Sequence, residues 1–401
     1  MTDTTTEKVS SAEGSPTRGG GLRGSTLLKH LGLMLLAFAG IALLLETLSP
    51  FRGSQIGELS YFVPAVAGLT LLTGLNGQIS LGHGALMAVA AYTTALLLEQ
   101  EQPLPFAVVI LIAVIITSLV GALVGAAAAR LHGPYLAGAT LALAVGVPGL
   151  ALYFEEELGG EQGLTVTPPR ASDAFESFYG TVIGNDLSTQ KFTAYLGWVL
   201  ALIVLLLLSN LVVSRYGRTW RAVRDDEIAA ELTGINLGRA RVLAFVVSSA
   251  CAAVGGVMIA VITRLTAPTT FTLVLSITLL VAIVLGGLGS LVGAILGSII
   301  VVFLRPFVTD RGLDAGLDAA QAANIAPLIY GIVLILVMLL APRGLVGSIR
   351  FAFLTRQATK RMAGASPGNG SSGSGSSSSG STGSSPSGGG MSRSGDGSSA
   401  T

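Results

Sequence analysis

Long apolar stretches separated by short polar ones occupy most of the chain. A membrane-crossing helix needs about 20 consecutive, mostly apolar residues. The pattern predicts an all-α polytopic membrane protein with about ten transmembrane helices, and eight is the nearest rival count. The stretches 77–98 and 273–288 are glycine-rich or short and could instead enter and leave on one side. The predicted segments are 26–48, 57–75, 77–98, 104–131, 134–154, 192–213, 242–264, 273–288, 290–308 and 325–341.

Polar tails flank the apolar part of the chain. Residues 1–25 are predicted to form a disordered N-terminal tail, because they offer little apolar area to bury. A transmembrane domain is predicted over 26–345. Residues 346–401 form the second tail, which is rich in Gly and Ser and is predicted to be disordered from about residue 366.

The composition agrees with a chain that lives in lipid. Hydrophobic residues make up 51% of it and charged residues only 11%, whereas a soluble domain carries about 25% charged residues. An aqueous enzyme is therefore a poor fit, and the net charge of +1 also argues against a nucleic-acid binder. The single cysteine, Cys251, cannot form an internal disulfide, and three scattered histidines do not suggest a zinc site. We expect no cofactor.

Arginine and lysine are concentrated in three places. Cytoplasmic loops of membrane proteins carry an excess of these residues. We therefore expect the N-terminus, the segment 215–241 and the C-terminal tail to lie in the cytoplasm, and the acidic segment 155–191 to lie outside. Ten crossings give this N-in/C-in arrangement. Five spans per half and a faint repeat, TLL at 70–72 and 278–280, leave two inverted halves with glycine-broken helices as an option.

The least lipid-like stretch inside a predicted span is Gly74–Gly84, which reads GLNGQISLGHG. A helix broken by glycine at this depth must be buried in protein or line a watery cavity, because its freed backbone groups need partners. The polar side chains there either cap the break or contact a polar ligand. For each residue alone, capping is the simpler interpretation. The candidates for ligand contact as a cluster are Asn76, Gln78, Ser80 and His83.

A charged stretch joins the sixth and seventh predicted spans. We predict one interfacial helix over 219–232, with Trp220, Val223 and Ile228 as its apolar members and Gly234 as its stop. A helix that lies on anionic lipid would be rich in Lys and Arg, whereas this one is mixed in sign and suits docking to a protein. The candidate docking residues are Arg221, Arg224, Asp225, Asp226, Glu227, Glu231 and Gly234.

The sequence has no evident energy source of its own. It contains no GxxxxGK[ST] phosphate-binding loop, so the chain cannot bind ATP in that manner. It also lacks the run of intramembrane acidic residues that an ion-coupled carrier often has. If the chain moves a solute uphill, the energy is expected to come from another subunit.

Two motifs resemble those of a known family. NGQISLGHGALMAVAAYTTALL at 76–97 and RYGRTWRAVRDDEIAAELTGINLGRARVLAFVVSSACAAVGG at 215–256 resemble the membrane subunit of branched-chain amino-acid ABC importers, and the M-type permease is the closer match. VLGGLGSLVGAILG at 284–297 and APRGLVG at 341–347 are in the same style. The resemblance covers residues 30–350. The Gly/Ser-rich tail and the acidic segment before the sixth span depart from the family's pattern.

The resemblance implies a subunit of an ATP-driven importer in the plasma membrane of a prokaryotic cell. It implies as partners a second permease subunit of the H type, two cytoplasmic ABC ATPase subunits, and an extracellular or periplasmic solute-binding protein. The segment 221–234 then resembles the coupling helix that docks on the ATPase, and 74–84 resembles part of the broken helix beside the translocation path. A urea or short-amide permease of the same class, a stand-alone channel or secondary carrier, and a membrane scaffold remain as alternatives.

Overall fold

Within the residues that it describes, the computed structural model of the chain is almost entirely helical. These residues are 22–316 apart from 101–103, 132–133 and 184–186, together with short pieces between 318 and 339. The second predicted tail and most of the predicted segment 325–341 lie outside them. The helices and strands are α1 (Leu22–Thr47), α2 (Pro50–Leu69), η1 (Thr70–Leu75), α3 (His83–Leu98), α4 (Phe106–Ala128), α5 (Pro134–Tyr153), α6 (Glu155–Leu158), β1 (Leu164–Thr165), α7 (Asp173–Ile183), α8 (Thr189–Val213), α9 (Arg215–Asp225), α10 (Glu227–Leu232), α11 (Leu237–Thr263), β2 (Leu265–Thr266), η2 (Pro268–Phe271), α12 (Leu273–Gly286) and α13 (Leu291–Asp314).

Seven helices among the described residues are long and apolar enough to cross a membrane. α2 continues into the π-helical turn η1, so that Pro50–Leu75 is one such helix, and α1 and α3 contain shorter apolar stretches. α1 begins at Leu22, slightly before the predicted start at residue 26. The all-α polytopic architecture predicted from the sequence is confirmed. The count of ten spans and the orientation across the membrane stay predictions.

α2 and α11 form the centre of the bundle. In their most apolar stretches 83% and 78% of the residues are buried, against 22% in α4 and α5. α11 packs against α2, α3, α4 and α8. Glycines allow this close approach, because a Cβ on Gly68 would lie 2.5 Å from the Cβ of Cys251, and a Cβ on Gly121 would lie 2.1 Å from the Oγ of Ser249.

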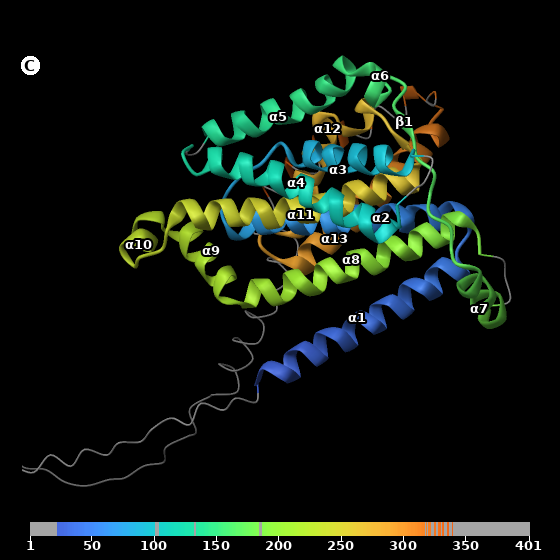
Figure 1. Ribbon diagram of the computed structural model, residues 1–401, viewed down its shortest axis with the longest axis horizontal. Coiled ribbons are helices and arrows are strands. Elements are labelled where there is room, and N and C mark those ends of the chain that lie inside the picture. Colours follow the sequence, from blue (N-terminus) through green and yellow to red (C-terminus); the bar gives the residue numbers. More distant parts are fainter. Residues whose placement is uncertain are drawn as a thin grey trace, which may run out of the picture. The chain divides into compact units, whose positions relative to one another are not determined.

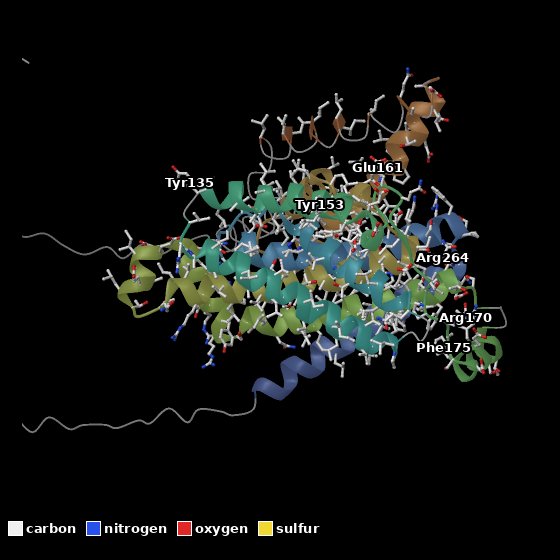
Figure 2. The ribbon with its side chains drawn as sticks, turned by 45° about the horizontal axis from the view of Figure 1, so that its top comes forward. Tyr135, Tyr153, Glu161, Arg170, Phe175 and Arg264 are labelled. Atoms are coloured by element: carbon white, nitrogen blue, oxygen red, sulfur yellow. The ribbon has the colours of Figure 1, made fainter. Side chains whose placement is uncertain are left out.

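The bundle has two different ends. At one end, α9 and α10 connect α8 with α11, whereas at the other end β1 and β2 pair antiparallel, with Leu164 opposite Thr266 (Figure 1). Figure 2 labels Glu161, Arg170 and Arg264 at this second end, away from α9 and α10. The connection from α5 to α8, which carries the acidic segment, therefore lies opposite the arginine-rich connection from α8 to α11.

A cluster around Glu46 of α1 stabilises the second end. Lys191 Nζ lies 2.7 Å from Glu46 Oε2, and the Tyr195 hydroxyl donates to Glu46 Oε1 at 2.6 Å. The Tyr179 hydroxyl of α7 is a second donor to Oε1. Partial burial and the hydrogen bond to Glu46 raise the pKa of Tyr179. The cluster holds α7 against α1 and α8.

Candidate functional site: a broken helix and a two-helix loop

The helix break lies between α2 and α3. η1 ends at Leu75, residues 76–82 are not helical, and α3 starts at His83. Gly77 has a φ of +76°, a left-handed conformation that favours glycine. The glycine-broken helix predicted over 74–84 is therefore present in the structure.

Side chains from two distant helices hold the non-helical segment. Thr140 Oγ1 of α5 accepts a hydrogen bond from the Leu81 N–H at 3.0 Å, and Ser276 Oγ of α12 accepts one from the Gly84 N–H at 3.0 Å. These bonds replace helical bonds that are lost at the break, where lipid offers no partners. Our reading of the sequence missed Thr140 and Ser276. Their one signal is a hydroxyl group within an otherwise apolar span.

The four candidate residues of the break are all buried, with at most 7% of any of them exposed. Ser80 Oγ accepts a backbone N–H two residues further on at 3.3 Å, and His83 Nε2 donates to the Ala65 carbonyl at 3.0 Å. Both amide atoms of Asn76, Oε1 of Gln78 and Nδ1 of His83 have no hydrogen-bond partner among the described residues. Buried polar groups almost always have a partner. Asn76 and Gln78 thus offer polar atoms that the described fold does not use.

The connection between α8 and α11 contains two helices, and we name it the two-helix loop (residues 214–236). The prediction of one helix over 219–232 was wrong. α9 ends at Asp225, and Asp226 takes an extended backbone conformation with φ −159° and ψ 111°. Asp226 Oδ1 accepts the Ala229 N–H at 3.0 Å. Asp is a strong N-cap residue, and here it begins a new helix inside the charged run.

α9 packs against the bundle. Trp220 and Val223 are each 1% exposed, and the Trp220 indole N–H donates to the Ala240 carbonyl of α11 at 3.0 Å. Arg221 Nη2 donates to the Val212 carbonyl at the end of α8, at 2.9 Å. These contacts fix α9 to both flanking spans.

Arg224 connects α9 to the helix break. Its Nη1 donates to the Gly74 carbonyl at 2.6 Å, while Nε and Nη2 donate to Asp225 Oδ1 at 3.1 and 2.8 Å. A Cβ on Gly77 would lie 3.0 Å from Arg224 Cγ, and a Cβ on Gly74 would lie 2.2 Å from the backbone nitrogen of Gly289. The two-helix loop, the break and the turn between α12 and α13 therefore meet around one guanidinium group.

α10 presents its two large apolar side chains outward, while Ala230 is buried. Ile228 and Leu232 are 74% and 84% exposed, and residues four apart lie on the same helical face. We name this pair the apolar ridge. Glu231, beside Leu232, is also exposed, and Gly234, with a φ of +85°, follows the end of the helix. The apolar residues predicted for one helix thus divide between a buried α9 and an exposed α10.

Several candidate docking residues have partners within the chain. Arg221 and Arg224 bind backbone carbonyls, and Asp226 caps α10. Glu227 Oε1 forms an ion pair with Arg241 Nη2 at 2.5 Å. Sequence reasoning assigned all of these charges to an external partner, because their carbonyl acceptors and the Arg241 partner cannot be seen in the local pattern.

A helical bundle whose described residues include seven membrane-length apolar helices defines a multi-pass membrane protein. Residues 56–341 match the family model described as "Branched-chain amino acid transport system / permease component". The match covers well over half of the chain, which therefore belongs to this family and is a multi-pass protein of the plasma membrane.

Curated relatives carry similar names. The chain is 32% identical over 287 residues to the high-affinity branched-chain amino acid transport system permease protein LivM of Salmonella typhimurium. The match covers 67% of this chain and 65% of the relative. It is 33% identical over 238 residues to LivM of Escherichia coli, and the match covers 56% of this chain and 55% of the relative. It is 26% identical over 225 residues to LivH of Salmonella typhimurium, and the match covers 52% of this chain and 68% of the relative.

The matched part thus spans somewhat over half the length of the LivM relatives. Among solved structures, PsaBC from Streptococcus pneumoniae in complex with Fab matches at 15% identity and a TM-score of 0.37, covering 76% of this chain and 96% of that one.

Proposed function

We propose that the chain is the membrane-spanning subunit of an ATP-driven importer for branched-chain amino acids. In this proposal it forms the translocation path with a second permease subunit of the H type and docks a cytoplasmic ATPase through residues 215–241. A solute-binding protein outside the cell delivers the amino acid. The names of the LivM and LivH relatives support the substrate class and the pairing of two permeases.

The apolar ridge of α10 is the observation that carries the docking proposal. Burying one large aliphatic side chain is worth about 1.5–3 kcal/mol, yet Ile228 and Leu232 are exposed. α10, which carries them, lies at one end of the bundle (Figure 1). Insertion into an anionic bilayer is disfavoured, because the exposed Glu231 lies beside the ridge. A protein groove with basic residues at its edge fits both the apolar and the acidic side chains.

In this proposal Arg224 transmits movement of the docked two-helix loop to the helix break beside the translocation path. A shift of α9 changes the position of the guanidinium group that holds the Gly74 carbonyl. Since Gly74 also lies against Gly289, the same shift acts on the break and on the turn between α12 and α13. We propose that ATPase movements reach the broken helix by this contact.

The unpartnered polar atoms of Asn76 and Gln78 support a place for the break beside the path. An amino acid carries both an ammonium and a carboxylate group, and amide side chains offer a donor and an acceptor to such a solute. Apolar spans around the break are compatible with a branched aliphatic side chain.

The docking proposal is tested by replacing the ridge. The full chain with Ile228→Asp and Leu232→Asp is co-expressed with the second permease and the ATPases, and the ATPase that co-purifies is measured. We expect a loss of about tenfold or more, because the buried anchors of an interface carry most of its binding energy. The matched control, Ile228→Val with Leu232→Met, retains an apolar ridge and should retain the ATPase. Unchanged co-purification of the aspartate variant would contradict docking through α10.

The substrate class is tested by competition. Uptake of labelled leucine at low concentration is measured in cells with and without this gene, with unlabelled isoleucine, valine or urea. We expect uptake to depend on the gene and to be inhibited by isoleucine and valine but not by urea. Gene-dependent uptake of labelled urea in place of leucine would identify a urea permease of the same class.

A further inference from the structure

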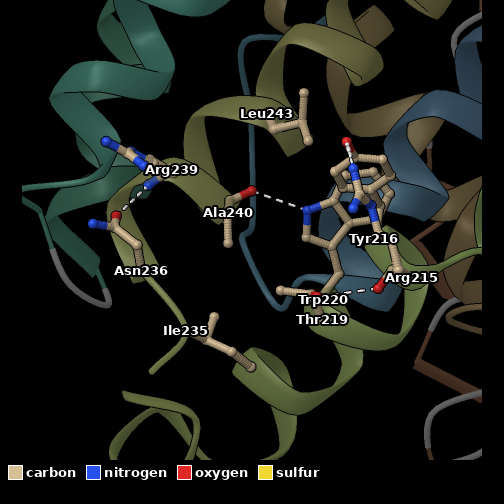
Figure 3. A pocket seen from close by; sticks show the side chains of 9 residues that line it. All are labelled: Arg215, Tyr216, Thr219, Trp220, Ile235, Asn236, Arg239, Ala240 and Leu243. Carbon is tan, nitrogen blue, oxygen red and sulfur yellow. Dashed lines mark hydrogen bonds between the residues drawn. The ribbon is translucent and has the colours of Figure 1, made fainter. Parts of the chain in front are cut away.

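α9 and α11, together with the segment between α10 and α11, line an open hollow of about 270 Å³ (Figure 3). Trp220, Ile235 and Leu243 give it an apolar wall, and Arg215 and Arg239 stand on opposite sides of it. None of the residues that line it carries a carboxylate. The hollow therefore combines positive charge with an apolar interior.

Most polar groups that remain available at this hollow are hydrogen-bond donors. The exception is Thr219 Oγ1, which donates to the Arg215 carbonyl at 3.0 Å and is left as an acceptor. Asn236 Oδ1 already accepts the Arg239 N–H at 2.9 Å, which leaves its amide Nδ2 as a donor. The Tyr216 hydroxyl accepts from Arg215 Nη2 at 3.0 Å, so its own proton is available. Neither Arg215 nor Arg239 forms an ion pair with a described carboxylate. A cationic rim made of donors selects an anionic group with several acceptor oxygens, such as a phosphodiester.

A second, apolar hollow of about 610 Å³ continues along α11. Val242 and Val246 line it, and it shares Asn236, Arg239 and Leu243 with the first hollow. α11 is one of the membrane-length helices, so this groove starts at an arginine near the end of a span and runs along the span. Arginine at such a position lies at the level of the lipid headgroups.

Basic and acidic residues occupy different parts of the two-helix loop. Arg215, Arg218 and Arg221 lie in the first two turns of α9, next to the ends of the spans. The acidic residues follow from Asp225 to Glu231, around the apolar ridge. One part of the loop thus suits an anionic bilayer surface and the other suits a protein with basic residues.

We propose that the hollow between α9 and α11 is a binding site for an anionic phospholipid. The phosphate lies between Arg215 and Arg239, and one acyl chain follows Val242 and Val246. A soluble phosphate compound satisfies the arginines but leaves the apolar groove unfilled, so the lipid uses more of the site. The bound lipid attaches α9 to the bilayer beside the docking ridge. This site requires only that the chain spans a membrane, and it is independent of the solute transported.

The test is binding of labelled phosphatidylglycerol to the purified full chain in detergent. We expect saturable binding that unlabelled phosphatidylglycerol displaces, whereas phosphatidylcholine and glycerol phosphate do not. Arg215→Gln with Arg239→Gln should weaken the affinity about 30-fold, because each basic residue at the headgroup level contributes about 1 kcal/mol. Arg215→Lys with Arg239→Lys keeps both charges and should retain most of the affinity.

A matched control removes the same charge elsewhere. Arg52→Gln in α2 with Arg311→Gln in α13 leaves the hollow intact, since neither residue lines it or lies in the two-helix loop, and should bind lipid as the wild type does. Leu243→Trp fills the space shared by the two hollows without changing charge and should weaken binding. The proposal is overturned if both glutamine double variants lose the same lipid affinity, or if Arg215→Gln with Arg239→Gln loses none. Displacement by glycerol phosphate as effective as by the lipid would identify a site for soluble phosphates instead.

Discussion

The two helices of the two-helix loop, α9 with 11 residues and α10 with 6, have opposite surroundings. α9 buries Trp220 and Val223 against α11 and uses Arg221 and Arg224 on carbonyls of the bundle. α10, only one residue further on, exposes Ile228 and Leu232. The comparison indicates that α9 belongs to the fold of the bundle, whereas α10 is a surface for a partner. Changes in α9 should therefore affect stability or transmission, and changes in the apolar ridge of α10 should affect binding.

The largest difference in stability is expected for apolar truncation. Trp220→Ala in α9 removes a side chain that is 1% exposed together with its hydrogen bond to Ala240, and should cost about 3–5 kcal/mol of unfolding free energy. Leu232→Ala in α10 removes an exposed side chain and should change it by less than about 0.5 kcal/mol. Denaturation of the purified chain in detergent measures both. Similar losses of unfolding free energy in the two variants would contradict the distinction between a buried α9 and an exposed α10.

Arg224 tests whether α9 transmits movement. Arg224→Ala removes the donor to the Gly74 carbonyl and should lower ATP-driven leucine uptake about tenfold, the effect of roughly 1.4 kcal/mol. The amount of ATPase that co-purifies should stay the same, because the apolar ridge is unchanged. Arg224→Lys keeps one donor and should recover part of the uptake. If ATPase binding falls in parallel with uptake, then Arg224 acts in docking rather than in transmission.

The smallest effect concerns the boundary between the two helices. Asp226→Ala removes the cap on the Ala229 N–H and should destabilise α10 by about 1 kcal/mol. Hydrogen exchange of the amides in 227–232 should become several-fold faster, with no change in α9. Asp226→Asn keeps a side-chain acceptor and should preserve the wild-type rate. Faster exchange throughout α9 as well would show that the two helices unfold as one unit.

Much of the fold could be predicted from hydrophobic pattern alone. The apolar runs predicted the all-helical membrane architecture, in which seven described helices are long and apolar enough to cross. The glycine-rich stretch predicted the position of the break, because lipid leaves few options for a non-helical backbone. The single helix over 219–232 was a mistake. Its apolar and polar residues fit one amphipathic helix, and Asp226 was counted as a docking charge although Asp is also a cap residue.

The partners of the site residues could not be predicted in the same way. Arg224 binds a carbonyl 150 residues away, and Gly84 binds a serine 192 residues away. Backbone carbonyls have no sequence signature, so a charged side chain that binds one looks the same as a side chain that binds a partner. Asn76 and Gln78 show the opposite case, since their polar atoms stay without a described partner and the sequence-based hypothesis for them remains open.

Uptake of labelled leucine into proteoliposomes tests the central claim most directly. Vesicles contain either this chain alone or this chain with the second permease, the ATPases and the binding protein, each with and without ATP on the ATPase side. We predict uptake only in the complete assembly with ATP, and its loss when the chain carries Ile228→Asp with Leu232→Asp. Leucine flux through vesicles that hold this chain alone, without ATP, would contradict the claim and identify a channel or carrier.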